Sequence, residues 1–135
     1  MKQADIVLPG LYSEYESLRR FISSFAQGEE YSAPFIEGLQ LTLKEAFVNA
    51  IRHGNRERCD LTVSIRLIAE ESTLLASIKD CGKGFTLDEL PNPVNHQNLF
   101  KLSGRGIYII RSIAEIIGLE KDPDGSALTL RYIPY

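Results

Sequence analysis

The sequence predicts an α+β fold, a two-layer α/β sandwich in which helices pack on one face of a mixed, mostly antiparallel sheet. Three segments place apolar residues every three or four positions, which is the spacing of an amphipathic helix. Two others, LTVSIRLIAE and SALTLRYIP, alternate apolar and polar residues, as strands with one solvated face do. With 135 residues, we expect a single domain over residues 1–135.

The chain is predicted to begin with a strand and a helix. Residues 4–10, ADIVLPG, form the strand, which a Pro-Gly pair ends. Residues 11–28 form the helix, because their apolar side chains recur at alternating steps of four and three. Ser13 and Glu16 have the spacing of a capping box near its start, and Gly28 is expected to end it.

A second helix and a pair of strands follow. The helix is predicted to begin after Ser32 and Pro34 and to run to Gly54. Its apolar stripe consists of Ile36, Leu39, Leu43, Phe47 and Ala50. Residues 61–70 and 72–80 are predicted as strands that a tight hairpin joins at a pair of glutamates.

The remaining chain is predicted as a long loop, a helix and a strand. From Gly84 to Gly104 the sequence is polar and aperiodic, and a loop of this length in a compact domain is usually a functional lid or disordered. The helix spans Gly104 to Gly118, and residues 126–134 form the last strand. The apolar stripe of this helix is Ile107, Ile110, Ile113, Ala114 and Ile117.

Composition narrows the class of protein. The net charge of −3 and the lack of a basic stripe argue against nucleic acid as a direct partner. No apolar run approaches membrane-spanning length, and the N-terminus lacks the apolar core of a signal peptide, so we expect a cytoplasmic protein without membrane contact. Cys59 and Cys81 fit neither a disulfide framework nor a four-ligand zinc site, so we expect two reduced thiols.

The second predicted helix carries an unusual polar row. Glu45, Asn49 and His53 lie four residues apart, so they form a continuous seam along the edge of the apolar stripe. Neighbouring members have Cβ atoms about 5–6 Å apart. Such a seam can present a carboxylate and an amide carbonyl to one small ligand. The alternative is a solvated helix face.

Two glycine-containing segments offer complementary groups. Asp80 ends an apolar strand and is followed by Gly82 and Gly84, which permit close backbone approach. A carboxylate beside apolar walls fits an exocyclic amine such as that of adenine. Gly104 and Gly106 open a helix, whose unpaired N–H groups and positive dipole end favour phosphate. Each segment alone is also compatible with a plain turn or helix entry, the commoner case for a single Asp-x-Gly-x-Gly, and neither a Walker A loop nor a Rossmann fingerprint is present.

In combination, these motifs resemble the N, G1 and G2 boxes of the Bergerat-fold ATPases, which are related to histidine kinases. The matching residues are Glu45, Asn49 and His53, then Asp80, Gly82, Gly84 and Phe85, then Gly104, Gly106 and Ile107. The resemblance implies that Asn49 binds Mg²⁺, that Asp80 binds the adenine amine and that Gly104 and Gly106 contact the phosphates of ATP. The full candidate set for nucleotide binding is Asn49, His53, Asp80, Gly82, Gly84, Gly104, Arg105, Gly106, Ile107 and Ser126.

Within that superfamily, the chain is most similar to the anti-sigma-factor serine/threonine kinases of bacterial partner-switching systems. The resemblance implies that Glu45 is the general base and that Arg105 offsets phosphoryl charge, although a solvated Arg105 is an equal alternative. It also implies a STAS-type anti-anti-sigma protein as substrate, a sigma factor as second partner, and a homodimer. Ser126 stands where family members often carry threonine. The competing hypotheses are a catalytically weak, nucleotide-dependent binding switch and an ATP-binding domain of a histidine kinase.

Overall fold

The structure, a computed structural model, describes residues 2–81, 104–123 and 125–135, without the side chains of residues 104–108, 121 and 122. Its centre is a five-stranded sheet in the order β1-β2-β3-β5-β4. The strands are β1 (Lys2–Pro9), β2 (Thr62–Ala69), β3 (Leu74–Asp80), β4 (Glu115–Asp122) and β5 (Gly125–Tyr132). All four pairings of this sheet are antiparallel.

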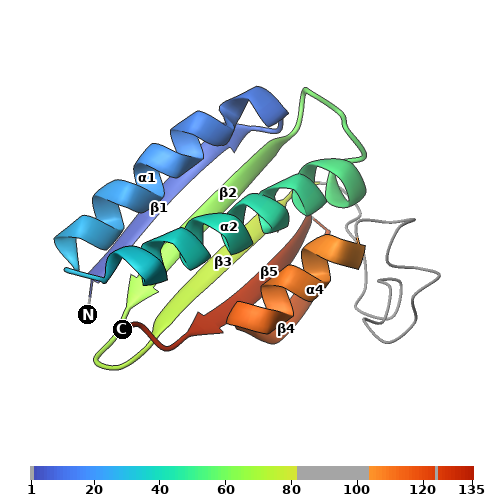
Figure 1. Cartoon of the computed structure of the whole chain (residues 1–135). Coiled ribbons are helices and arrows are strands. Elements are labelled where there is room, and N and C mark those ends of the chain that lie inside the picture. Colours follow the sequence, from blue (N-terminus) through green and yellow to red (C-terminus); the bar gives the residue numbers. More distant parts are fainter. Residues whose placement is uncertain (1, 82–103, 124) are drawn as a thin grey trace.

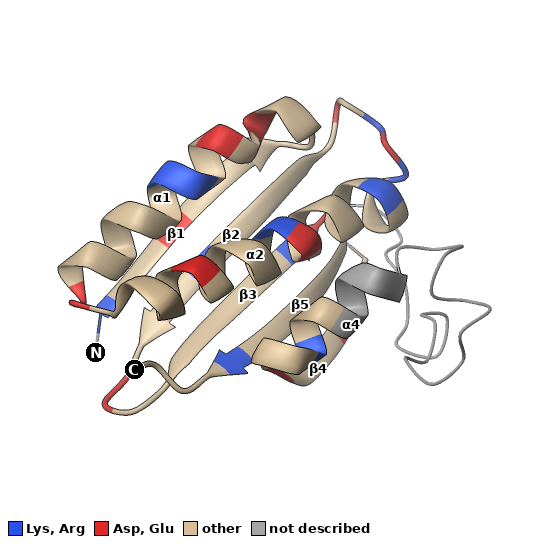
Figure 2. Ribbon diagram, viewed as in Figure 1, with Lys and Arg blue, Asp and Glu red and all other residues tan. Residues whose placement is uncertain are grey.

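Helices cover one face of the sheet (Figure 1). They are α1 (Tyr15–Gly28), α2 (Ala33–Asn49) and α4 (Gly104–Ile113), and a short 3₁₀ turn, η1 (Tyr12–Glu14), precedes α1. The predicted two-layer α/β sandwich with a mostly antiparallel sheet is therefore confirmed. In Figure 2, the acidic residue near the start of α1 is followed by basic residues, whereas acidic and basic residues alternate along the loop that leads to β2.

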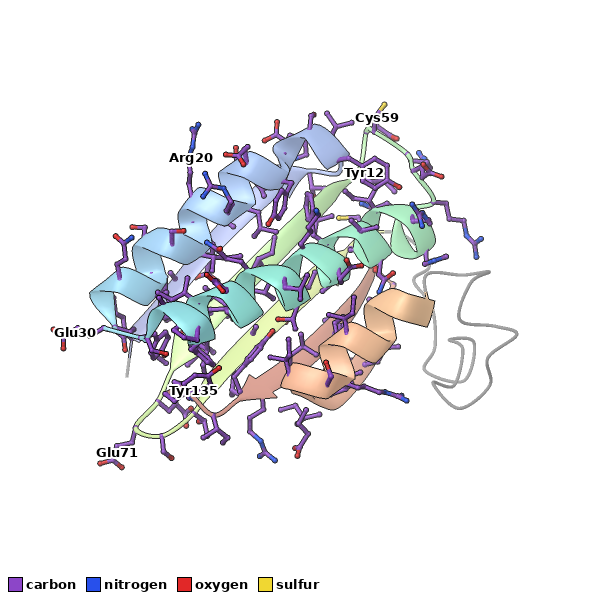
Figure 3. All side chains as sticks on the ribbon, in the orientation of Figure 1. Tyr12, Arg20, Glu30, Cys59, Glu71 and Tyr135 are labelled. Carbon is purple, nitrogen blue, oxygen red and sulfur yellow. The ribbon has the colours of Figure 1, made fainter. Side chains whose placement is uncertain are left out.

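The core lies between the two layers, and the sequence pattern explains how each layer contributes to it. Strand alternation directs every second side chain of β2, β3 and β5 toward the helices. These buried strand residues are Val63, Ile65, Leu67, Leu74, Ala76, Ile78, Leu128, Leu130 and Tyr132. Helix periodicity supplies Leu18, Ile22 and Phe25 from α1 and Leu39, Leu43 and Phe47 from α2. Figure 3 shows that side chains fill the space between the layers, whereas Arg20 and Cys59 point away from it.

Helix α2 has a defined start and an unusual end. The Ser32 hydroxyl caps it by accepting a 3.3 Å hydrogen bond from the backbone N–H of Phe35. At its C-terminus the helix continues as a π-helical turn, η2 (Ala50–Gly54), which the hydrogen bond from Asn55 N to Ala50 O closes at 2.7 Å. The predicted helix up to Gly54 is thus present, with a widened last turn.

Two local predictions are wrong. The capping box of Ser13 and Glu16 does not form, because η1 occupies these positions and Glu14 becomes the N-cap of α1, without a side-chain cap. The helix predicted from Gly104 to Gly118 ends at Ile113, and the residues after it form β4. Strand β4 was therefore not predicted. The hairpin between β2 and β3 is as expected, closed by a 2.9 Å bond from Glu70 N to Thr73 O.

In the part of the chain that the structure describes, no helix is both long and apolar enough to cross a membrane.

Candidate functional site

Asp80, the last residue of β3, forms one side of the candidate site. It follows Ile78 by two residues, so strand alternation directs its carboxylate toward the helix layer, where the residue is 3% exposed. In register it lies between Val63 of β2 and Ser126 of β5. Ser126 is itself buried. A buried carboxylate is costly unless hydrogen-bonded groups satisfy it, so this position at a sheet end is typical of a binding site.

Asn49, the last residue of α2, forms the opposite side. It is 1% exposed, and neither its Oδ1 nor its Nδ2 has a hydrogen-bond partner among the described residues. Leaving a buried amide unpaired costs about 1–3 kcal/mol, so a ligand that pairs with it recovers this free energy. Glu45 and His53 are only half-buried. Of these three residues, only Asn49 therefore lies fully inside the protein.

The π-helical turn joins the two sides. It carries Gly54 into contact with Asp80, because a Cβ added at residue 54 would lie 2.1 Å from Oδ2 of Asp80. Such a distance is far below van der Waals contact, so only glycine fits here. The widened turn thus lets the carboxylate approach the end of the helix that bears Asn49.

A second glycine, Gly125 of β5, lies against the backbone of Asp80. Gly125 has a φ of +150°, and a Cβ on it would lie 1.8 Å from the carbonyl oxygen of Asp80. Both the left-handed φ and the close approach require glycine at this position. Asp80 is thereby held at its side chain by Gly54 and at its backbone by Gly125.

Asn55 was not predicted as a site residue. It is 1% exposed, donates a 3.0 Å hydrogen bond to the carbonyl of Thr62, and accepts a 2.8 Å bond from the backbone N–H of Cys81. Its position directly after Gly54 at the end of a helix resembles an ordinary cap. Only the fold shows that it links η2 with both β2 and β3.

A small cavity adjoins the Asp80 carboxylate. Its walls are Ala46 of α2 and Ala50 of η2 with Ile78, Leu119 and Leu128 of the sheet. The volume is about 10 Å³, which is enough for roughly one water molecule. A carboxylate between apolar walls can accept a hydrogen bond from a small donor group, and a larger ligand would need space outside this cavity.

The remaining predicted residues lie at the same end of the fold. Gly104, Arg105, Gly106 and Ile107 form the first turn of α4, of which the structure describes only the backbone. Figure 1 shows that this turn, the end of α2 and the end of β3 gather at one end of the molecule. The first N–H groups of α4 have no intrahelical partners, so they favour an anion at this end of the fold. Gly82 and Gly84, with the predicted lid up to residue 103, lie outside the described residues.

Metal ligation at this site would depend on oxygen atoms. Among the residues that the structure describes, no three His, Cys, Asp or Glu side chains group closely enough to hold a metal ion. Mg²⁺ is usually held by one or two protein oxygens together with phosphate oxygens and water. The unpaired Oδ1 of Asn49 fits this requirement.

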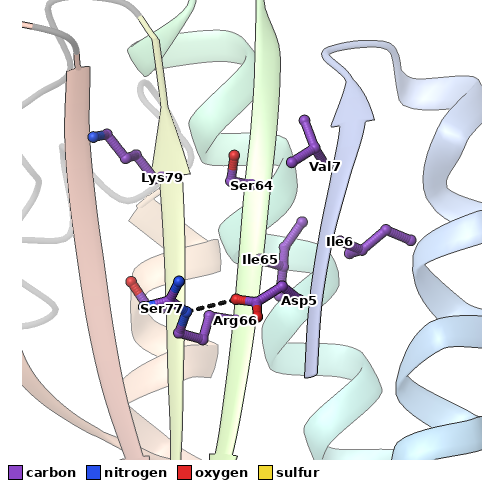
Figure 4. A pocket seen from close by; sticks show the side chains of 8 residues that line it. All are labelled: Asp5, Ile6, Val7, Ser64, Ile65, Arg66, Ser77 and Lys79. Carbon is purple, nitrogen blue, oxygen red and sulfur yellow. Dashed lines mark hydrogen bonds and ion pairs between the residues drawn. The ribbon is translucent and has the colours of Figure 1, made fainter. Parts of the chain in front are cut away.

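The opposite face of the sheet has a separate hollow of about 400 Å³ (Figure 4). Its lining comes from β1, β2 and β3 and includes the ion pair between Asp5 and Arg66 as well as Lys79. The pKa of Asp5 is lowered, chiefly by its hydrogen bond from Arg66. Because strand alternation places these residues away from the helices, this hollow is not continuous with the buried carboxylate of Asp80. Cys59 and Cys81 are free and exposed.

Comparison with known proteins agrees with this geometry. The family model of the histidine kinase-like ATPase domain matches residues 8–132. The serine-protein kinase RsbW of Listeria monocytogenes serotype 4a is 24% identical over 127 residues, which cover 89% of this chain and 81% of that protein. The anti-sigma F factor of Bacillus velezensis is 28% identical over 115 residues, covering 83% and 79%.

A solved structure shows the same fold. The crystal structure of the RsbU and RsbW domains of Rv1364c from Mycobacterium tuberculosis superposes with a TM-score of 0.60 at 15% identity. The match covers 99% of this chain and 33% of that one, so the present chain corresponds to a third of the larger protein. With a family model that spans nearly all of its residues, the chain belongs to the histidine kinase-like ATPase domain family.

Proposed function

We propose that this protein is an anti-sigma factor and an ATP-dependent serine/threonine kinase that phosphorylates an anti-anti-sigma protein in a bacterial partner-switching system. The family match and the two kinds of relative, a serine-protein kinase and an anti-sigma factor, support the class. The observation that carries the proposal is the buried amide of Asn49, which lacks a partner on the side of the helix that also bears Glu45. An unpaired polar group inside an otherwise satisfied core is typical of a ligand site.

Nucleotide binding would use both sides of the site. Asp80 accepts a hydrogen bond from the exocyclic amine of adenine, and the backbone N–H groups at Gly104 and Gly106 bind phosphate oxygens. Asn49 would hold Mg²⁺ through Oδ1, and the ion would supply positive charge next to the phosphates. Arg105 adds a positive charge at the same helix end, while His53, Ile107 and Ser126 complete the proposed contacts.

Glu45 would act as the general base. It lies one helical turn before Asn49, so the Cβ atoms of the two residues are about 5–6 Å apart. Because Glu45 is half-buried, a hydroxyl from a second protein can reach its carboxylate. The carboxylate would accept the proton as the hydroxyl oxygen bonds to the γ-phosphorus of ATP, and the bond from that phosphorus to the leaving ADP would break. The acceptor would be a serine or threonine of a STAS-type anti-anti-sigma protein. The unphosphorylated partner would compete with a sigma factor for this protein, which we propose to be a cytoplasmic homodimer.

Phosphoryl transfer tests the proposal directly. The full chain is incubated with Mg²⁺ and ATP and with each STAS-type protein of the same genome, and phosphoserine or phosphothreonine is located by mass spectrometry. We expect Mg²⁺-dependent phosphorylation of one such protein, lost in Glu45→Gln. Glu37→Gln is the matched control, because Glu37 lies on the same helix two turns earlier and is exposed.

The outcomes separate the competing functions. Transfer that persists in Glu45→Gln would remove Glu45 as the base. If ATP changes the affinity for a partner and no phosphoprotein forms, the protein is a nucleotide-dependent binding switch. If the chain binds no nucleotide, both proposals are wrong.

A further inference from the structure

We propose that Asn55 is a positioning residue for base recognition, which fixes Asp80 and so sets the preference for adenine over other bases. The inference rests on the proposed nucleotide site, and it assigns to that site a residue that makes no contact with the base. It rests on three hydrogen bonds of Asn55, on the burial of this residue and on the contact between Gly54 and Asp80.

The end of β3 is a place where the sheet would otherwise open. The β2–β3 ladder has its last paired residues at Val63 and Asp80, so Thr62 and Cys81 lie just beyond it. The side chain of Asn55 bridges these two strands, because Nδ2 donates to the Thr62 carbonyl at 3.0 Å and Oδ1 accepts from the Cys81 N–H at 2.8 Å. One carboxamide thus replaces the next step of the ladder.

Asn55 is itself rigidly placed. Its backbone N–H closes the π-helical turn on Ala50 O at 2.7 Å, and its side chain is buried. A Cβ on Gly10 would lie 2.9 Å from Nδ2 of Asn55, so the chain after β1 packs against it as well. A buried amide with partners on both of its polar atoms fixes the elements it joins, since breaking either bond leaves an unpaired group.

Asn55 and Gly54 together fix the position of Asp80. The peptide that follows Asp80 is held by Asn55, and its carboxylate contacts Gly54, the residue before Asn55. Two consecutive residues of one turn therefore fix both the backbone and the side chain of Asp80. Without the Asn55 side chain, the exposed 3.3 Å contact between Thr62 Oγ1 and Cys81 Sγ remains, but the Cys81 N–H loses its buried partner. The Cys81 peptide can then move relative to β2, and the direction of the Asp80 carboxylate moves with it.

The preference of the site for adenine over hypoxanthine depends on the direction of the Asp80 carboxylate. Adenine presents an exocyclic amine that donates to a carboxylate, whereas hypoxanthine presents a carbonyl oxygen at the same position, which a carboxylate repels. A site that pairs with one group rejects the analogue because its own buried polar group is then left unpaired. The ratio of affinities for ATP and ITP therefore measures whether the Asp80 carboxylate is oriented toward the amine of adenine.

The experiment is calorimetric titration of the full chain with Mg²⁺–ATP and Mg²⁺–ITP. We expect the wild type to bind ATP more tightly than ITP. In Asn55→Ala, the ratio of the affinities for ATP and ITP should be about tenfold or more below that of the wild type, chiefly because ATP binds more weakly. Partial unfolding lowers both apparent affinities by the same factor, so the ratio is unaffected by it. Asn55→Asp, which keeps an acceptor for the Cys81 N–H, provides a milder second variant with an expected ratio between those of wild type and Asn55→Ala.

Gln40→Ala is the matched control. It removes a half-buried amide of α2, which donates to Ser23 Oγ at 2.7 Å on the side facing α1, so it should lower stability and leave the ratio unchanged. Ratios for both Asn55 variants within about twofold of wild type would overturn the inference. Equal affinity of the wild type for ATP and ITP would also overturn the inference, because Asp80 would then not distinguish adenine from hypoxanthine. Failure of the wild type to bind either nucleotide would instead contradict the proposed function.

Discussion

Gly54 and Asp80 are in direct contact, although they belong to different layers of the fold: a Cβ at residue 54 would lie 2.1 Å from Oδ2 of the carboxylate. The contact joins the end of the helix that carries Asn49 to the end of the strand that carries Asp80. Since these two residues are the proposed ligands for opposite ends of one nucleotide, the Gly54 contact sets the separation of the phosphate and adenine subsites.

We therefore expect Gly54→Ala to displace the Asp80 carboxylate. Overpacking of this kind costs about 1–3 kcal/mol, and ATP affinity should fall by about tenfold or more. Chemical denaturation and calorimetry measure the two effects. Gly38→Ala is the matched control on the same helix, because its Cβ would lie 3.4 Å from Ile113 Cγ2, and replacing a helical glycine adds up to about 1 kcal/mol of helix propensity. Normal ATP binding by Gly54→Ala would show that the contact is not required.

Asn49 should show opposite effects on stability and on ligand binding. Replacing the unpaired amide by leucine removes a buried polar group at similar volume, so the free energy of unfolding without ligand should rise by about 1–2 kcal/mol. The same variant should no longer be stabilised by Mg²⁺–ATP, because Oδ1 is gone. Urea unfolding with and without nucleotide tests both expectations. A destabilised Asn49→Leu would mean that the amide is satisfied within the protein.

The sequence pattern predicted most of the fold because the apolar periodicities of α1, α2, β2 and β5 are regular. Strand β4 was missed for an identifiable reason. A bulge between Ile116 and Gly118 shifts the register, so that Ile116 and Leu119 pair with core positions of β5 while lying three residues apart. A spacing of three is a helical signal, and it extends the genuine periodicity of α4 past its true end at Ile113.

The sequence predicted only those residues of the candidate site that belong to short motifs. Asn49 and Asp80 stand in recognisable motifs, and the structure places both in the buried layer. The roles of Gly54 and Asn55 depend on contacts with residues about 26 positions away in the chain, Asp80 and Cys81, and on a π-helical turn that no local periodicity encodes. Sequence alone therefore could not distinguish them from an ordinary helix end.

Two glycines of the C-terminal hairpin should respond oppositely to alanine. Gly118 lies within the edge strand β4, its φ is not positive, and no atom lies within 4 Å of an added Cβ. Gly118→Ala should therefore stabilise the protein by about 0.4–1 kcal/mol, because it restricts the unfolded chain without strain. Gly125→Ala should destabilise it by about 1–3 kcal/mol, because φ is +150° and the Cβ would lie 1.8 Å from Asp80 O. Urea midpoints measure both, and a neutral Gly125→Ala would contradict the close approach.

Tyr132 provides a pH-dependent test at the end of the sheet away from Asp80. Its hydroxyl is buried and lies 2.6 Å from that of Thr42, and burial raises the pKa of Tyr132 far above its usual value of about 10. At neutral pH, Tyr132→Phe should cost about 1 kcal/mol through the lost hydrogen bond. Above pH 10 the unfolded wild type releases this proton and the folded protein retains it, so stability falls as pH rises.

The difference in stability between wild type and Tyr132→Phe should therefore shrink as the pH increases from 9 to 11. Above the unfolded pKa of about 10, the wild type loses roughly 1.4 kcal/mol per pH unit from this residue, so the two proteins should be about equally stable near pH 11. Tyr15 and Tyr31, whose pKa values are also raised by burial, titrate in both proteins and cancel in the difference. Urea unfolding at each pH measures the curve. A constant difference in stability would show that the Tyr132 hydroxyl ionises equally in the folded and unfolded protein. The wild type and Tyr132→Phe should bind Mg²⁺–ATP equally at neutral pH, because Tyr132 pairs with Leu74 at the end of β3 far from Asp80.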